Sequence, residues 1–277
     1  MSNILVVESG STKTDWILVT PSESKHYHSV GINPASDSVM PDLMEICPEL
    51  TIKLDEVNKV YYYGAGVIDR ETRSLVRTMI AKYSPTADFT IESDLLGACV
   101  ATCHSSSGIV SILGTGSNSC LYQNGTLTQI NPALGYIMSN EGGGTTIGKS
   151  IVKQFFYNQM PTKVKSEFES NYPIERVGFI TRLYRAPNPT AFLANFAPFI
   201  NTVSDLEWRK SLLTSIFQEF IDIRIKCFED YHKYPLHFVG SIAYFCREEL
   251  RETLQHNGLE ATTILQRPIE RLVTIHK

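Results

Sequence analysis

The chain has 277 residues, of which 43% are hydrophobic, and its formal net charge is -4. This length suffices for a sizeable core in one large domain or two smaller lobes, of which we expect two lobes. The slightly acidic balance gives no electrostatic reason to expect nucleic acid or an anionic membrane as a partner.

Other features favour a cytoplasmic protein that acts on small molecules. The first residues, MSNILVV, enter a predicted strand without a basic flank or a small-residue cleavage pattern, so we expect no signal peptide. No apolar run approaches the ~20 residues of a membrane helix. The six cysteines show no CxxC spacing. Cys99 and Cys103 share a predicted helix face with apolar neighbours, so we expect buried reduced thiols. The chain also lacks the paired cysteine ligands that an iron–sulfur cluster would need.

The first predicted unit runs from Ile4 to Leu18 and consists of an apolar strand, a turn of small polar residues and a second strand. Small residues from Ser9 to Thr12 let the backbone turn tightly and aim N–H groups and hydroxyls into one concavity, which suits a phosphate. Lys13 can add a positive charge. An ordinary hairpin turn explains this single loop equally well.

A second unit, Ile109–Tyr122, repeats the same order of strand, turn and strand, and its Gly116–Ser117 can be superposed on Gly10–Ser11. Two phosphate-type loops in equivalent places indicate a duplicated domain whose halves face each other across a cleft. A third pair, Gly240–Ser241, follows the apolar run Leu236–Val239 and opens an amphipathic segment.

Periodicity predicts the remaining elements of the first half. We expect strands at Lys25–Val30, Lys59–Tyr63 and Ala87–Ile91 and helices at Arg70–Lys82 and Leu95–Cys103. His26 and His28 share a face of the first of these strands, where simple exposure explains them better than a metal site. Asn33 follows that strand in an Asn-Pro turn and presents both a donor and an acceptor.

The polar segment His104–Gly108 separates the two copies, so we expect lobes at 1–106 and 107–277. The second lobe contains a predicted helical insertion at about 160–234, in which Leu206–Tyr231 is the longest helix candidate. A helix at Ile242–Leu254, a strand at Thr262–Leu265 and a closing helix at Pro268–His276 complete the chain. The closing helix could pack back on the first lobe.

Gly143–Ser150 fits the letters of the Walker A motif. A P-loop NTPase needs a core strand just before the loop, but this chain has polar residues at 139–141. It also needs a later apolar strand that ends in Asp, and we find no such strand after residue 150. We therefore prefer a helix that starts at Thr145 and buries residues such as Ile147, Ile151 and Phe155.

Eight ordered motifs resemble the BadF/BadG/BcrA/BcrD-type ATPase family, and within it bacterial-type N-acetylglucosamine kinases of the sugar-kinase, Hsp70 and actin superfamily. The matching segments are GSTKTDW (Gly10–Trp16), GINPA (Gly31–Ala35), YYGAG (Tyr62–Gly66), ESDLLGA (Glu92–Ala98), LGTGSNS (Leu113–Ser119), LGYIMSNEGGG (Leu134–Gly144), YRAPNPTAFLANFAPF (Tyr184–Phe199) and FVGSIAYF (Phe238–Phe245). The resemblance implies an α/β fold: a two-lobed actin-like ATPase of duplicated ribonuclease H-like domains with a central ligand cleft.

The resemblance also implies ATP and Mg²⁺ as cofactors, a sugar substrate and a homodimer. The implied ATP-binding residues are Gly10, Ser11, Thr12, Lys13, Gly114, Thr115, Gly116, Ser117, Gly240 and Ser241. The implied sugar-binding residues are Asn33, Ala65, Gly66, Asp94, Asn118, Tyr136, Asn140 and Glu141. The metal is expected near Glu8, through water.

Asp94 lies between the strand predicted at Ala87–Ile91 and the helix predicted at Leu95–Cys103. Asp is a favoured N-cap, but the carboxyl end of a strand in an open α/β sheet is also where catalytic groups collect. Phosphoryl transfer to an alcohol needs a carboxylate that orients the hydroxyl and accepts its proton. The resemblance assigns this role to Asp94, and one residue can serve both purposes.

Two positions depart from the family pattern. Glu8 stands where Asp is usual, and its extra methylene moves the carboxylate by roughly 1.5 Å near an ion that demands near-ideal octahedral geometry. Asn140, in Ser139–Gly142, replaces the acid of the Gly-Asp-Glu-Gly motif by a neutral amide.

We predict ATP-dependent phosphorylation of an amino sugar, namely N-acetylglucosamine at its 6-hydroxyl. The alternatives are a catalytically weakened sugar- or nucleotide-binding regulatory protein and an ATPase that activates another enzyme.

Overall fold

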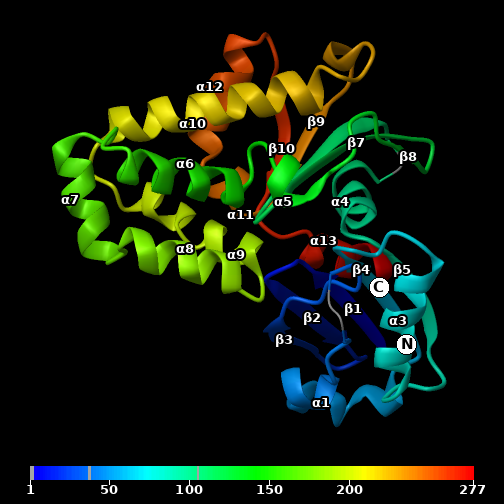
Figure 1. The fold of residues 1–277 in the computed structure, drawn as a ribbon. Coiled ribbons are helices and arrows are strands. Elements are labelled where there is room, and N and C mark those ends of the chain that lie inside the picture. Colours follow the sequence, from blue (N-terminus) through cyan, green and yellow to red (C-terminus); the bar gives the residue numbers. More distant parts are fainter. Residues whose placement is uncertain (1–2, 37–38, 105) are drawn as a thin grey trace. The chain divides into compact units, whose positions relative to one another are not determined.

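The computed structural model describes residues 3–36, 39–104 and 106–277, and the chain divides into two compact units (Figure 1). Unit 1 consists of Met1–Ser106 together with Arg267–Lys277, and unit 2 consists of Ser107–Gln266. Each unit contains a mixed five-stranded sheet. The fold is therefore α/β, as expected.

The sheet of unit 1 has the order β3-β2-β1-β4-β5. Its strands are β1 (Ile4–Ser9), β2 (Lys13–Val19), β3 (Ser24–Val30), β4 (Lys59–Gly64) and β5 (Asp88–Ser93). The hairpins β1–β2 and β2–β3 are antiparallel, whereas β4 lies parallel to both β1 and β5. The central strand β1 is buried on both faces from Ile4 to Val7, which explains its unbroken apolar run.

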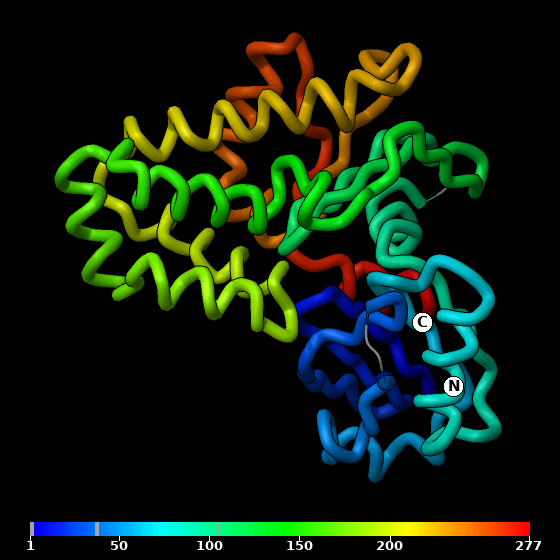
Figure 2. Tube along the Cα trace, viewed as in Figure 1, coloured from blue at the N-terminus to red at the C-terminus, as the bar shows by residue number. Residues whose placement is uncertain are grey.

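Helices cover both faces of this sheet. They are α1 (Leu43–Ile46), α2 (Pro48–Thr51), the 3₁₀ turn η1 (Leu54–Glu56), α3 (Arg70–Ala81), α4 (Asp94–Cys103) and α13 (Ile269–His276). Leu5, Val7 and Trp16 pack with α1–α3, and Ile4 and Val6 pack with α4 and α13. Figure 2 shows the red C-terminal helix returning to the blue N-terminal strands.

Unit 2 repeats this topology with the order β10-β9-β6-β7-β8. Its strands are β6 (Gly108–Leu113), β7 (Ser117–Gln123), β8 (Thr126–Thr128), β9 (Leu236–Val239) and β10 (Ala261–Leu265). The antiparallel pairs β6–β7 and β7–β8 and the parallel pairs β6–β9 and β9–β10 match those of unit 1. This match confirms the duplication that the repeated turns predicted.

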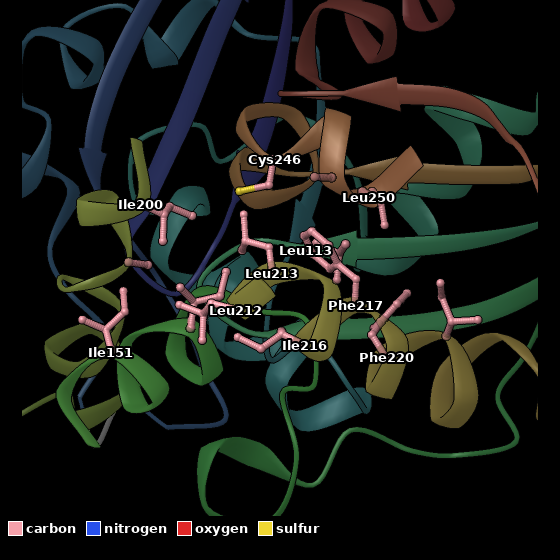
Figure 3. Close-up of a cluster of buried hydrophobic side chains, with 14 of the residues drawn as sticks. Leu113, Ile151, Ile200, Leu212, Leu213, Ile216, Phe217, Phe220, Cys246 and Leu250 are labelled. Carbon is pink, nitrogen blue, oxygen red and sulfur yellow. The ribbon is translucent and has the colours of Figure 1, made fainter. Parts of the chain in front are cut away.

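Helices that follow β8 in the chain build most of the core of unit 2. They are α5 (Gly135–Met138), α6 (Gly144–Phe156), α7 (Thr162–Asn171), α8 (Arg176–Arg185), α9 (Pro189–Ala194), η2 (Ala197–Asn201), α10 (Leu206–Phe220), the π-helix η3 (Ile221–Ile225), η4 (Tyr231–Lys233), α11 (Ser241–Phe245) and α12 (Arg247–His256). Figure 3 shows Leu113 of β6, Phe217 and Phe220 of α10, and Leu250 of α12 in this core.

Several predicted elements have different bounds in the structure. The helix predicted at Leu206–Tyr231 changes to a π-helix after Phe220 and ends at Ile225. The helix predicted at Ile242–Leu254 is two helices, because the backbone leaves the helical region at Cys246. The helices α1 and α2 and the turn η1 were not predicted. Five of the six cysteines are buried and all six are free.

No helix in the described ranges is long and apolar enough to cross a membrane.

Candidate active site

The turn between β1 and β2, residues Gly10–Thr12, is held tightly by its surroundings, and we call it the first glycine turn. Gly10 N donates to Lys13 O at 2.9 Å, which closes the turn. Gly31 packs against it so closely that a Cβ atom there would lie 2.4 Å from Gly10 O. Ser11 is half-buried, and Thr12 and Lys13 are exposed. These three residues can therefore reach a ligand from a rigid backbone.

Three acidic side chains lie near this turn. Glu8 and Asp15 face each other across the β1–β2 ladder. Burial, with a further contribution from the charges of Asp15 and Asp94, raises the pKa of Glu8 to about 7, against the opposing charges of Lys13 and Arg267. A carboxyl group that is ready to lose its proton near neutral pH is typical of a functional site.

Asp94 is the first residue of α4 and follows the last residue of β5 directly. The N-cap is Ser93, whose hydroxyl accepts from Leu96 N at 3.2 Å, so the alternative in which Asp94 is the N-cap is not the one observed. Asp94 Oδ1 accepts from Leu95 N at 2.8 Å. Burial raises the pKa of Asp94 to about 6, against the lowering effect of backbone hydrogen bonds. Asp94 thus has a pKa suited to proton transfer near neutral pH.

Asp15 is a member of this cluster that the sequence analysis missed. Its side chain is only 4% exposed and is contacted by three basic groups: His28 Nδ1 at 2.6 Å, Lys13 Nζ at 3.3 Å and Arg267 Nη1 at 3.6 Å. His28 lies on an exposed strand face, as predicted, with its side chain 63% exposed, but its contact with Asp15 was not predicted. The predicted hairpins could have revealed this cluster, because their register pairs Glu8 with Asp15 and Asp15 with His28.

Asn33, Ala65 and Gly66 come together in unit 1. Asn33 Oδ1 accepts from Ala35 N at 3.1 Å, so the Asn33 side chain stabilises the Asn-Pro turn. A Cβ atom on Gly66 would lie 1.9 Å from the same oxygen, so Asn33 packs directly on the Gly66 backbone. Ala65 N donates to Ser9 O at 2.8 Å, which fixes this loop next to the first glycine turn.

The corresponding turn of unit 2, Gly114–Gly116, is the second glycine turn. Strand register aligns Leu113–Ser117 with Ser9–Thr14, so Gly114 corresponds to Gly10, and the superposition of Gly116–Ser117 on Gly10–Ser11 is wrong. At Gly240, where φ is 121°, a Cβ atom would lie 2.4 Å from Leu113 O. The third Gly-Ser pair therefore packs against the start of the second glycine turn.

The Walker-like segment is helical, as preferred. The helix α6 begins at Gly144, and its first N–H groups donate to the second glycine turn: Gly144 N to Gly114 O at 2.8 Å and Thr145 N to Thr115 O at 2.9 Å. Lys149 lies within the helix and donates to Tyr136 O. The start of α6 thus supports the second glycine turn and forms no P-loop.

Asn140 and Glu141 contact other protein groups. Asn140 has a φ of 79°, which Asn tolerates better than most residues, and its Oδ1 accepts from Ser117 N at 3.4 Å. Its side chain thus faces the second glycine turn. Glu141 forms an ion pair with Arg224 at 2.8 Å, a partner that the sequence analysis missed.

Asn118 and Tyr136 lie elsewhere in unit 2. Asn118 Oδ1 accepts from Gln129 Nε2 at 2.6 Å, and Tyr136 is half-buried on α5 with Lys149 over its ring at 5.5 Å. Within the described part of the chain, no hydrogen bond joins Asn118, Tyr136, Asn140 and Glu141 to one another. The four predicted sugar-binding residues of this unit therefore do not form one hydrogen-bonded network.

In residues 3–36, 39–104 and 106–277, no group of three or more His, Cys, Asp or Glu side chains could hold a metal ion. Mg²⁺ that arrives with a nucleotide needs only one or two carboxylates besides the phosphates. The negative charges that raise the pKa of Glu8 would be relieved by such a cation. Glu8 and its acidic neighbours therefore fit a magnesium–nucleotide complex.

The two α/β units with the same strand order agree with the two-lobed, actin-like fold of sugar kinases that have been solved. No protein-family model and no curated protein matches the chain. Among solved structures, two proteins named "putative N-acetylglucosamine kinase" are similar. The one from Porphyromonas gingivalis is 33% identical, with a TM-score of 0.90 over 99% of this chain and 98% of its own. The chain belongs to the family of that protein.

The second of these proteins, from Chromobacterium violaceum, has 13% identity and a TM-score of 0.74, over 100% of this chain and 99% of its own. A glucokinase of the ROK family from Streptomyces griseus, solved with glucose and AMPPNP, has 8% identity and a TM-score of 0.55, over 99% of both chains. These two similarities support the fold alone.

Proposed function

We propose that the chain is a carbohydrate kinase that transfers the terminal phosphoryl group of ATP to an amino sugar, with the 6-hydroxyl of N-acetylglucosamine as the acceptor. The observation that carries the proposal is the 33% identity, over almost the whole of both chains, to a protein of that name. The raised pKa of Asp94 supports it, because phosphoryl transfer to an alcohol needs a base that works near neutral pH.

In this mechanism Asp94 orients the acceptor hydroxyl and takes its proton as the phosphoryl group is transferred. Its contact with Leu95 N holds the carboxylate at the start of α4. The two glycine turns and Lys13 bind the phosphates, and the Gly240–Ser241 pair binds the adenosine. Mg²⁺ bound near Glu8 would neutralise part of the negative charge of the phosphates.

For the sugar, we propose that Asn33 and the loop at Ala65 and Gly66 contact the hydroxyls. Their support is their close packing next to the first glycine turn. We keep Asn118, Tyr136 and Glu141 as sugar-binding candidates from unit 2. For Asn140, the contact with Ser117 N supports a role at the phosphates in addition to the sugar.

The test is ADP release from Mg-ATP with a panel of acceptors: glucosamine, N-acetylglucosamine, N-acetylmuramate and glucose. We expect turnover with N-acetylglucosamine and a product phosphorylated at the 6-hydroxyl, as determined by NMR. Calorimetry with each sugar alone separates binding from turnover. Heat of binding without turnover on any sugar would favour the weakened regulatory protein, and ATP hydrolysis that no sugar changes would favour the activating ATPase.

We also propose that the protein works as a homodimer in the cytoplasm, where ATP and phosphorylated sugars are used, and binds no nucleic acid. The dimer is checked by light scattering coupled to size-exclusion chromatography, with a mass of twice 31.1 kDa expected. A monomer at micromolar concentration would contradict this part of the proposal.

A further inference from the structure

Arg224 is a fully buried charge in a position that the helix pattern reserves for an apolar side chain. It is 1% exposed and lies in the π-helix that continues α10. Phe217, Phe220 and Ile221 precede it on the same buried face, and Ile225 follows it. Lys226 N donates to Ile221 O at 3.0 Å, the five-residue spacing of a π-helix. Such turns are frequent at functional sites.

The guanidinium of Arg224 makes two kinds of contact. Nε and Nη2 both donate to Glu141 Oε2 at 2.8 Å. Nη1 donates to the carbonyl oxygens of Asn131 at 2.6 Å and Pro132 at 3.1 Å. Both Glu141 contacts therefore use one carboxylate oxygen. Glu141 Oε1 makes no hydrogen bond to the part of the chain that the structure describes, and the Glu141 side chain is 13% exposed.

The surroundings hold Arg224 and Glu141 in place. Ser119 on β7 donates its hydroxyl to Arg224 O at 2.8 Å, which ties the π-helix to the sheet. The turn after Glu141 rests on α10, because a Cβ atom at Gly142 would lie 3.0 Å from both Phe220 and Leu113. The Glu141 carboxylate is thus fixed from two sides with one oxygen left to accept a hydrogen bond.

Stability alone does not explain this arrangement. Replacing a buried ion pair by apolar groups of similar volume is often neutral or stabilising, because the pair must first lose its water. A Leu or Met side chain at position 224 would match the neighbouring core. The charge is therefore better explained by what it does to Glu141 and to the segment from Asn131 to Glu141.

We infer that Arg224 is a positioning residue for the sugar acceptor. It binds Glu141 through Oε2 and so directs Oε1 to accept a hydrogen bond from a sugar hydroxyl. Through Asn131 and Pro132 it also fixes the start of the segment that carries Tyr136. This inference rests on the proposed kinase function and adds a residue that none of the sequence motifs contains.

The test compares kinetic constants of Arg224→Lys, Glu141→Gln and the double variant with those of the wild type. Lysine keeps the charge, but its single nitrogen cannot reproduce the planar fork. We expect the KM for the sugar to rise about 10-fold or more in each single variant, while the KM for ATP changes by less than about threefold. Because Arg224 acts through Glu141, Arg224→Lys should have little further effect in the Glu141→Gln background.

A matched control comes from the same unit. Arg209 and Glu249 form a second sheltered ion pair at 2.8 Å, with side chains 18% and 12% exposed, between α10 and α12. Arg209→Lys should change thermal stability without changing the KM for the sugar. Arg224→Met combined with Glu141→Gln removes both charges and should keep a Tm close to that of the wild type while the sugar KM stays high.

The outcomes separate the two proposals. Wild-type protein that neither binds nor phosphorylates any sugar of the panel overturns the kinase function and this inference together. Wild-type turnover with an unchanged sugar KM in Arg224→Lys overturns the inference alone. So does an equal, additive loss of sugar affinity in both Glu141 backgrounds, because Arg224 would then act independently of Glu141.

Discussion

Replacing Asp94 by Asn should nearly abolish phosphoryl transfer and at the same time make the protein more stable. Burial raises the pKa of Asp94 from 3.8 to about 6, so the folded protein holds the charged carboxylate at a free-energy penalty. Asn has nearly the same shape, stays neutral and can still accept from Leu95 N. The substitution therefore removes the penalty, and it also removes the base.

The size of both effects can be estimated. Loss of a general base should lower kcat by about 10²-fold or more, with little change in sugar binding. A pKa difference of about 2 corresponds to at most about 3 kcal/mol, and we expect about 1 to 3 kcal/mol because the side chain is only partly buried.

The direction of the Asp94 pKa shift determines the pH range in which Asp94→Asn stabilises the protein. The folded pKa of Asp94 lies above its unfolded value, so its contribution to stability is most favourable below pH 3.8 and is lost as pH rises to about 6. The stability difference between Asp94→Asn and wild type should therefore be near zero at pH 4 and level off above about pH 6. The acid limb of wild-type kcat/KM should fall below about pH 6 as Asp94 becomes protonated.

Urea unfolding at pH 4 and pH 8 measures the stability, and coupled ADP release measures the rate. Asp88, at the exposed start of the same strand, provides the control, since Asp88→Asn should change neither. Near-normal turnover in Asp94→Asn would remove Asp94 from the mechanism. An Asp94→Asn variant that is less stable than wild type at pH 8 would show that the Asp94 carboxylate does not destabilise the folded protein.

Three further predictions follow from the glycine and asparagine contacts. Asn140→Gly keeps the positive φ and removes the contact with Ser117 N, so it should raise the KM for ATP about 3- to 10-fold and affect the sugar KM less. Gly66→Ala must displace Asn33 Oδ1 and should raise the KM for the sugar about 10-fold in steady-state assays. Gly31→Ala would push into the first glycine turn, and it should cost about 1 to 3 kcal/mol in urea unfolding and weaken ATP binding in calorimetry. Equal losses for both substrates in either of the first two variants would contradict the assigned contacts.

Local patterns predicted the strands and turns well because each is determined by nearby residues. The apolar runs of β1 and β6 and the small residues after them specify hairpins without help from the rest of the chain. The duplication was visible for the same reason. Two features were not predicted: the break between α11 and α12 and the change to a π-helix after Phe220. Both depend on packing in the core of unit 2, and the periodicity of the sequence carries no information about that packing.

The candidate site was predictable only in part, since its electrostatics depend on residues far apart in the chain. Arg267 reaches Asp15 from a segment more than two hundred residues away, and Arg224 reaches Glu141 across 83 positions. Neither arginine lies in a recognisable motif. Asn140 shows the opposite limit, because its motif was recognised but its positive φ turns the side chain toward the second glycine turn.

The two units share a topology but differ in the chemistry of equivalent positions. The strand register makes Ile112 and Asn118 of unit 2 the counterparts of Glu8 and Asp15 of unit 1. The same ladder position thus carries a pair of acids in one unit and an apolar residue with a neutral amide in the other. Charge crowding, which raises the pKa of Glu8, can therefore arise only in unit 1 at this position. Both units have a glycine turn after the first strand of the hairpin, but only unit 1, which also holds Asp94, has acidic side chains at this ladder position.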